Sequence, residues 1–152
     1  VAAYTRTIEL YPEYHDAYGS RGLAYFRLGQ YEKAFADYQI AIKHRPNDAK
    51  VLSNMGYIYF MRNELDKAEE VYRKSIQFDP RFVDARRNLG AVLAMKKNFP
   101  AAIEQWKEGL KYEPNNATLL FYIGSGYRDM GQPEKSGEWF ERAYAIEPGL
   151  RK

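Results

Sequence analysis

Two asparagines and their aromatic and basic neighbours are the side chains whose type and spacing favour a binding site. Asn54 and Asn88 stand 34 residues apart, and an amide can bind both the N–H and the C=O of an extended peptide. Tyr57 and Phe60 follow Asn54 by three and six residues, which places them near one helical stripe as apolar contacts. Arg87 can hold a carboxylate with its planar guanidinium. These residues predict a site for a short peptide with a hydrophobic anchor and an acidic residue.

Catalytic and metal-binding chemistry has little basis in this sequence. The 152 residues include no cysteine and only two histidines, His15 and His44, so thiol nucleophiles, disulfides and Cys-ligated metals are excluded. We find no carboxylate pair, glycine-rich phosphate loop or nucleophile–base arrangement. We therefore predict a protein that is not an enzyme, with no catalytic residue, no metal site and no cofactor.

Composition narrows the classes of partner. The 45% hydrophobic content predicts a folded protein, and the net charge of +3 is too small and too scattered for nucleic-acid binding. Charged residues interrupt the chain before any apolar run reaches the roughly 18 residues that span a bilayer, so we expect no membrane insertion. Nothing directs export, which favours the cytoplasm without identifying the compartment. A protein or peptide partner is the remaining expectation.

The positions named above belong to a period of 34 residues. Prolines recur at this interval, and so do a glycine column and an aromatic column. These three columns are Pro12, Pro46, Pro80, Pro114 and Pro148; Gly22, Gly56, Gly90 and Gly124; and Tyr38, Tyr72, Trp106 and Phe140. Because glycine has no side chain, we expect each glycine to admit the aromatic ring of a neighbouring helix.

Each period predicts two amphipathic helices joined by a short turn. Leu52, Met55 and Tyr59 follow helical spacing before the turn, and Ala68 and Tyr72 follow it afterwards. A left-handed residue is expected in each turn, and the four positions are Gly29, Asn63, Lys97 and Gly131. Lysine does not suit that conformation, so we expect the turn at Lys97 to be built differently.

This pattern resembles the tetratricopeptide repeat, whose period is 34 residues. The resemblance implies an all-α fold, a right-handed αα solenoid of stacked antiparallel helix pairs. It divides the chain into four repeats after the second helix of a truncated repeat at residues 1–14. The four repeats are 15–48, 49–82, 83–116, and 117–152 with the C-terminal end. Arg21 departs from an otherwise apolar column, where we expect looser packing or an outward-turned guanidinium.

The resemblance also implies a non-catalytic scaffold that binds a peptide segment of a partner protein. Family members hold peptide backbones with asparagines on the concave face, which the first helix of each pair lines. On that face the candidate peptide-binding residues are Phe26, Asn54, Tyr57, Phe60, Arg87, Asn88 and Phe121. For Asn54 and Asn88 the alternative is a solvated face or a bond within their own helix. For Phe26 and Phe60 it is packing against the next first helix.

Other functions remain open at this stage. The array could be a rigid structural or self-assembly spacer, or the substrate-presenting repeat domain of a larger enzyme such as a glycosyltransferase. We also expect an uncovered last face at Tyr144, Ile146 and Leu150. Burial of a few such side chains drives association, so weak end-to-end self-association is predicted.

Overall fold

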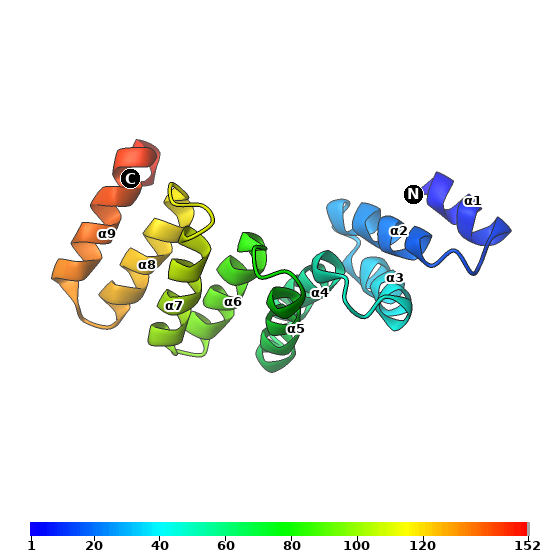
Figure 1. Cartoon of the computed structure of the whole chain (residues 1–152), viewed down its shortest axis with the longest axis horizontal. Coiled ribbons are helices and arrows are strands. Elements are labelled where there is room, and N and C mark those ends of the chain that lie inside the picture. Colours follow the sequence, from blue (N-terminus) through cyan, green and yellow to red (C-terminus); the bar gives the residue numbers. More distant parts are fainter. Residues whose placement is uncertain (152) are drawn as a thin grey trace. The chain divides into compact units, whose positions relative to one another are not determined.

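The computed structural model describes residues 1–151, which form helices and short connections (Figure 1). The α-helices are α1 (Ala2–Leu10), α2 (Asp16–Arg27), α3 (Tyr31–His44), α4 (Ala49–Met61), α5 (Leu65–Phe78), α6 (Val83–Met95), α7 (Phe99–Leu110), α8 (Ala117–Asp129) and α9 (Pro133–Ile146). A 3₁₀ helix, η1 (Pro148–Arg151), follows α9. The described residues include no strand, which confirms the predicted all-α fold.

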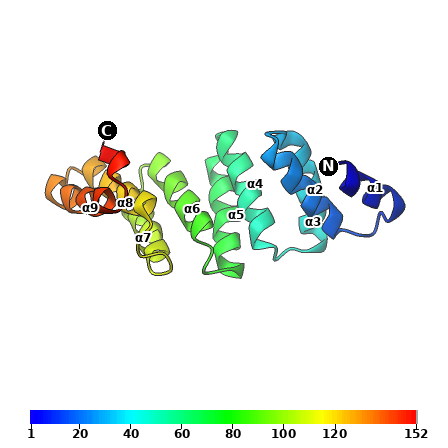
Figure 2. The same cartoon turned by 90° about the horizontal axis from the view of Figure 1, so that it is seen from above.

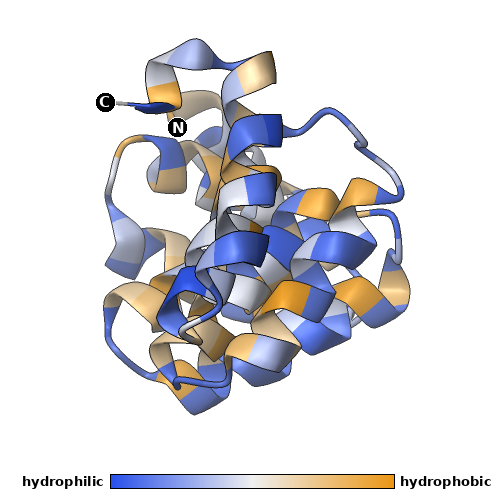
Figure 3. Cartoon of the chain, turned by 90° about the vertical axis from the view of Figure 1, so that its left-hand side faces the viewer, coloured by the Kyte–Doolittle hydropathy of each residue, from blue (hydrophilic) through white to orange (hydrophobic). Residues whose placement is uncertain are grey.

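The helices form two compact units, Val1–Asp79 and the part from Pro80 onward. In the first unit α2 packs against α1 and α3, and α4 packs against α3 and α5. In the second unit the contacts run from α6 through α7 and α8 to α9. Figure 2 shows α2 beside α3 and α4 beside α5. Hydrophilic and hydrophobic positions share individual helices (Figure 3), as amphipathic helices require.

The glycine column admits the aromatic column, as expected from the sequence. A Cβ atom added at Gly22 would lie 2.8 Å from the ring of Tyr38, and one at Gly90 would lie 2.1 Å from Nε1 of Trp106. The remaining two glycines meet Tyr72 and Phe140 in the same way. Tyr38 and Tyr72 are at most 1% exposed. These contacts bring the two helices of each pair close enough to share one core.

The turns within the helix pairs share one geometry, and the expectation for Lys97 was wrong. Lys97 has φ of 60°, close to 59° at Asn63, 70° at Gly29 and 69° at Gly131. The N–H of the next residue, Asn98, donates to the carbonyl oxygen of Leu93 at 2.9 Å. The other three turns contain the corresponding bond, which is typical of a helix C-terminus closed by a left-handed residue. The closing hydrogen bonds therefore hold even a lysine in this conformation.

Arg21 is not turned outward, which corrects the expectation for this residue. Its Nε and Nη2 each donate to a carboxylate oxygen of Asp37 at 2.8 Å, and Nη1 donates to Oγ1 of Thr5 at 3.3 Å. Asp37 is only 4% exposed. The hydrogen bonds with this carboxylate raise the pKa of Arg21 above its ordinary value. The charged pair therefore joins α2 to α3 and reaches α1.

Helix α9 is partly covered by η1. The Arg151 guanidinium lies 5.1 Å from the Tyr144 ring centroid and donates to both carboxylate oxygens of Glu141 at 2.6 Å. Tyr144 and Leu150 are half-buried, whereas Ile146 is 45% exposed. End-to-end association through these residues stays a prediction.

Candidate functional site

The Asn54 side chain links α4 to the core of the preceding helix pair. Its Nδ2 donates to the Tyr38 hydroxyl oxygen at 3.0 Å, so its partner is neither solvent nor its own helix, the two alternatives expected from the sequence. Burial raises the pKa of Tyr38 to about 12, and the hydrogen bond from Asn54 opposes that rise. One amide N–H is thus already used. The structure records no bond from a described residue to Oδ1 of Asn54, so this oxygen can accept a hydrogen bond from a ligand.

Aromatic side chains form a cluster beside Asn54. The Phe26 ring on α2 lies 5.3 Å from Tyr57 on α4 and 5.4 Å from Tyr31 at the start of α3. Tyr31 and Tyr57 lie 5.9 Å apart. All three are half-buried. Burial and the hydrogen bond with Tyr31 raise the pKa of Tyr57. We call Phe26, Tyr31 and Tyr57 the aromatic cluster.

The aromatic cluster shows whether Phe26 packs against the next first helix, the alternative to ligand binding that the sequence left open. Phe26 does pack against the next first helix, through Tyr57, but its incomplete burial leaves surface for a ligand. Sequence reasoning missed Tyr31, because it searched the first helix of each pair and Tyr31 begins a second helix. Phe60, near the end of α4, is half-buried as well. The first unit thus groups Asn54 with an apolar, partly open surface.

The candidate residues in the second unit are more engaged with their neighbours. Arg87 Nη1 lies 2.9 Å from a carboxylate oxygen of Asp84, and its Nε donates to Oδ1 of Asn88 at 3.4 Å. The Phe121 ring lies 5.0 Å from Phe140, the aromatic residue packed on the glycine of its own pair. Arg87 is therefore partly neutralised, and Phe121 contributes to packing within the pair.

Neither metal-binding clusters nor membrane-spanning helices occur in the described part of the chain. Among residues 1–151, no group of three or more His, Asp or Glu side chains is placed to hold a metal ion. His15 and His44 instead stack on each other, with ring centroids 3.2 Å apart. None of the described helices is both long and apolar enough to cross a bilayer.

Solved structures of other proteins share the fold. "Crystal structure of MamA" aligns with a TM-score of 0.90 at 20% identity, covering 99% of this chain and 88% of that one. "MamA MSR-1 C2" aligns with a TM-score of 0.77 at 24% identity, covering 90% and 78%. At these identities the likeness establishes the fold alone. No curated protein matches the chain by sequence.

Family profiles identify the repeats along the sequence. The profile described as "TPR repeat" matches residues 22–62 and 56–97. Two profiles described as "Tetratricopeptide repeat" match residues 3–36 and 97–150. These matches agree with the 34-residue period and with the helix pairs of both units. On this evidence the chain belongs to the tetratricopeptide repeat family.

Proposed function

We propose that this chain is a non-catalytic protein-interaction module that binds an extended peptide segment of a partner protein on the first helices of its pairs. Membership of the tetratricopeptide repeat family and the shared fold support a protein-interaction scaffold in general. The observation that carries the finer proposal is the position of Asn54 beside the aromatic cluster. An amide that can bind peptide backbone lies next to apolar surface that can hold an anchoring side chain.

The internal hydrogen bond to Tyr38 prepares Asn54 for this role. A side chain that is already oriented loses less conformational freedom when it binds a ligand. Oδ1 accepts from a peptide N–H, and the second amide N–H donates to a peptide carbonyl. An apolar peptide side chain packs on Phe26 and Tyr57, with Phe60 as a further contact. Affinity is modest, because a flexible peptide loses freedom on ordering.

The second unit, taken by itself, carries a separate set of candidate contacts. Asn88 presents an amide one repeat after Asn54, and Arg87 offers a guanidinium to an acidic residue of the peptide. Because Arg87 is paired with Asp84, a ligand carboxylate must share or replace that partner. Phe121 contributes apolar surface only where Phe140 does not cover it. We therefore expect the first unit to bind such a peptide more tightly than the second.

Peptides selected on the purified chain from a random phage-displayed library test the proposal. Fluorescence anisotropy of a selected, labelled peptide then compares Asn54→Ala and Tyr57→Ala with the unchanged chain. Each substitution should weaken binding, and Asn54→Ala should do so by roughly 1–3 kcal/mol, the cost of unmatched polar groups.

Tyr38→Phe is the matched control, because it removes the internal hydrogen bond and leaves the Asn54 amide in place. It should bind the peptide less tightly than the unchanged chain, because Asn54 loses its orienting bond, but more tightly than Asn54→Ala, which has no amide. If no peptide is selected, or if Asn54→Ala and Tyr57→Ala bind normally, the proposal fails. The chain would then be better described as a rigid spacer, or as the repeat domain of a larger enzyme.

A further inference from the structure

A groove of about 580 Å³ lies on the second unit, along α7 and the turn between α8 and α9. It involves the second helices of two pairs and so differs from the first-helix surface of the proposed peptide site. Pro100, Ile103 and Met130 give it an apolar floor. Ile103 is 5% exposed and Met130 is half-buried. The floor is thus fixed by packing and still offers contact area.

Two lysines converge on one tyrosine at the edge of this groove. Lys107 Nζ donates to the Tyr127 hydroxyl oxygen at 2.8 Å and lies 5.2 Å from the centroid of that ring. Lys135 Nζ lies 5.6 Å from the same centroid and donates to Oε1 of Gln132 at 2.9 Å. Among residues 1–151, no carboxylate lies within ion-pair distance of either ammonium group. Glu104 and Glu108 also line the groove but form no ion pair with these two lysines, and the lining as a whole carries a net charge of +1, from three lysines and two glutamates.

The other repeats show which part of this arrangement is unusual. Lys33 lies 5.5 Å from the Tyr25 ring centroid, and Lys67 lies 5.6 Å from that of Tyr59. These are the positions of Lys135 and Tyr127 in earlier repeats, so one lysine over this tyrosine belongs to the repeat architecture. The additional lysine near Tyr127 is Lys107, which belongs to the preceding helix pair.

Carboxylates neutralise two of the three cations that lie near Tyr25 and Tyr59 in those earlier repeats, Lys67 and Arg21 but not Lys33. Lys67 pairs with Glu64 at 2.6 Å. A second cation, Arg21, does lie near Tyr25, but Asp37 neutralises it. Within the groove itself, Lys111 pairs with Glu108 at 2.5 Å. Lys107 and Lys135 are thus the groove cations that remain available to a ligand.

We propose that this groove binds an acidic segment of a partner protein, in which a glutamate or aspartate stands next to an apolar residue. The ligand carboxylate accepts hydrogen bonds from Lys107 and Lys135, relieving the repulsion between their charges. The neighbouring apolar side chain packs on Ile103 and Met130. Charge complementarity and the apolar floor together favour this occupant over a neutral or basic segment.

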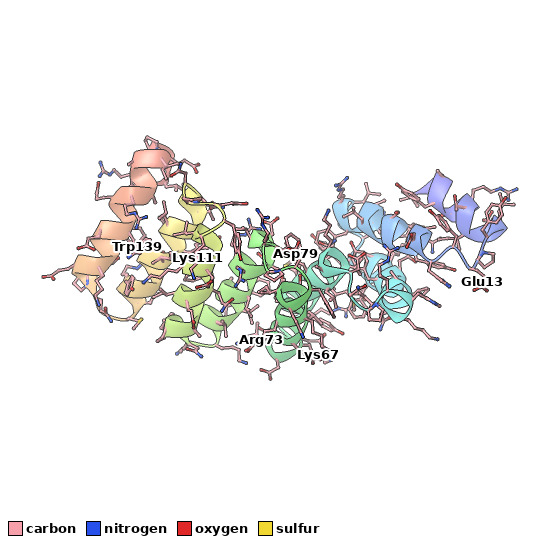
Figure 4. All side chains as sticks on the ribbon, viewed as in Figure 1. Glu13, Lys67, Arg73, Asp79, Lys111 and Trp139 are labelled. Atoms are coloured by element: carbon pink, nitrogen blue, oxygen red, sulfur yellow. The ribbon has the colours of Figure 1, made fainter. Side chains whose placement is uncertain are left out.

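Trp139 provides the reporter for this site. Lys107 Nζ lies 5.4 Å from the Trp139 ring centroid, and the indole is half-buried. The second tryptophan, Trp106, is only 4% exposed. Figure 4 labels Trp139 on α9 and Lys111 just after α7. Binding that moves Lys107 should therefore change the emission of Trp139.

The test titrates the full chain with the peptide acetyl-Glu-Leu-Glu-Phe-Glu-amide and with its matched version, in which every Glu is replaced by Gln. The acidic peptide should change Trp139 emission in a saturable and salt-sensitive way, and the Gln peptide should not. Lys107→Gln with Lys135→Gln should weaken binding about tenfold, because two rim charges are lost. Lys33→Gln, which removes a lysine over the equivalent tyrosine of the first unit, should leave binding unchanged.

Several outcomes would overturn the proposal. They are equal binding of both peptides, normal binding by the double lysine variant, and no saturable binding of the acidic peptide. Sedimentation equilibrium separates a second copy of the chain as occupant, because the double variant would then lose self-association while neither peptide binds. Lys135→Gln alone, at an exposed position, keeps the test valid if the double variant unfolds. Asn54→Ala should leave binding of the acidic peptide unchanged. A failure of this proposal can therefore be distinguished from a failure of the proposed function.

Discussion

The α2–α3 pair of the first unit and the α6–α7 pair of the second use the same repeat positions with different side chains. Both place an aromatic ring on a glycine, Tyr38 on Gly22 and Trp106 on Gly90. The Tyr38 hydroxyl accepts a hydrogen bond from Asn54 of the next pair. Trp106 Nε1 instead donates at 3.0 Å to the carbonyl oxygen of Arg87, within its own pair. The first arrangement thus connects the core to the candidate binding surface, and the second is closed within the pair.

The charged residues differ at matching positions too. Arg21 and Asp37 of the first pair correspond to Leu89 and Gln105 of the second. Helix α6 carries its buried arginine, Arg86, at another position, where Nε and Nη2 donate to the carbonyl oxygen of Pro80 at 3.1 and 2.9 Å. The repeat period therefore determines where backbones meet, while each pair satisfies its buried polar groups locally.

Asp37→Ala should have the largest effect on this comparison. It leaves the Arg21 guanidinium, whose side chain is 18% exposed, without its carboxylate. Breaking a buried ion pair is strongly destabilising, so we expect the free energy of unfolding to fall by about 3 kcal/mol. Urea unfolding followed by far-UV circular dichroism measures this loss.

Gln105→Ala is the control at the matching position of the α6–α7 pair. Its Oε1 accepts only a long hydrogen bond of 3.4 Å from Arg86, which keeps the Pro80 carbonyl as a partner. We expect a loss below about 1 kcal/mol. The double variant Arg21→Leu with Asp37→Gln copies the second pair and should recover most of the stability. Equal losses for Asp37→Ala and Gln105→Ala would show that the ion pair has no special role.

High pH should destabilise the first pair specifically. Because burial raises the pKa of Tyr38 to about 12, the folded state favours the neutral phenol relative to the unfolded chain, where the pKa is about 10. This contribution is complete below pH 10 and is lost as pH rises from 10 to 12. The free energy of unfolding should fall by up to about 1.4 kcal/mol per pH unit in that range.

Tyr38→Phe separates this effect from the titration of other tyrosines. Urea midpoints at pH 8 and pH 11 should differ less for Tyr38→Phe than for the unchanged chain, since phenylalanine does not ionise. The indole of Trp106 at the matching position does not titrate either, so the α6–α7 pair contributes no such slope. An identical decline in both proteins would assign the pH dependence to exposed tyrosines.

The backbone scaffold could be predicted from the sequence because it depends on small sets of periodic residues. Gly22 and Gly90 indicate close approach, Pro46 and Pro80 indicate where second helices end, and all four behave as expected. The helix pairs and the family follow from the same period. These features depend on backbone sterics, which a 34-residue repeat imposes identically on each copy.

The partners of polar side chains could not be predicted in the same way. Asn54 bonds to Tyr38, and Arg21 bonds to Asp37, across 16 residues and two helices in each case. Such pairings depend on rotamers and on the exact spacing of packed helices, which one sequence does not reveal. The candidate site shows the same division: its positions follow from the period, but the participation of Tyr31 follows only from three-dimensional packing.

Lys97→Gly should give the smallest effect, and it should be stabilising. Lys97 is exposed and has φ of 60°, a conformation that is strained for residues with a Cβ atom and free of that strain for glycine. The hydrogen bonds that close the turn involve only backbone atoms and remain in the variant. Glycine also gains freedom in the unfolded chain, which opposes part of the benefit. We expect the free energy of unfolding to rise by about 0.5–1 kcal/mol.

Gly29→Lys is the reciprocal control in the α2–α3 pair, where Gly29 has φ of 70° and nothing lies within 4 Å of an added Cβ atom. A steric clash therefore cannot explain a loss of stability in Gly29→Lys. If the free energy of unfolding falls by a similar amount, the cause is the backbone conformation. Both tryptophans, Trp106 and Trp139, belong to the second unit, so fluorescence-detected urea unfolding follows Lys97→Gly and circular dichroism follows Gly29→Lys. A neutral or destabilising Lys97→Gly would mean that the lysine side chain stabilises its turn by more than the strain that it introduces.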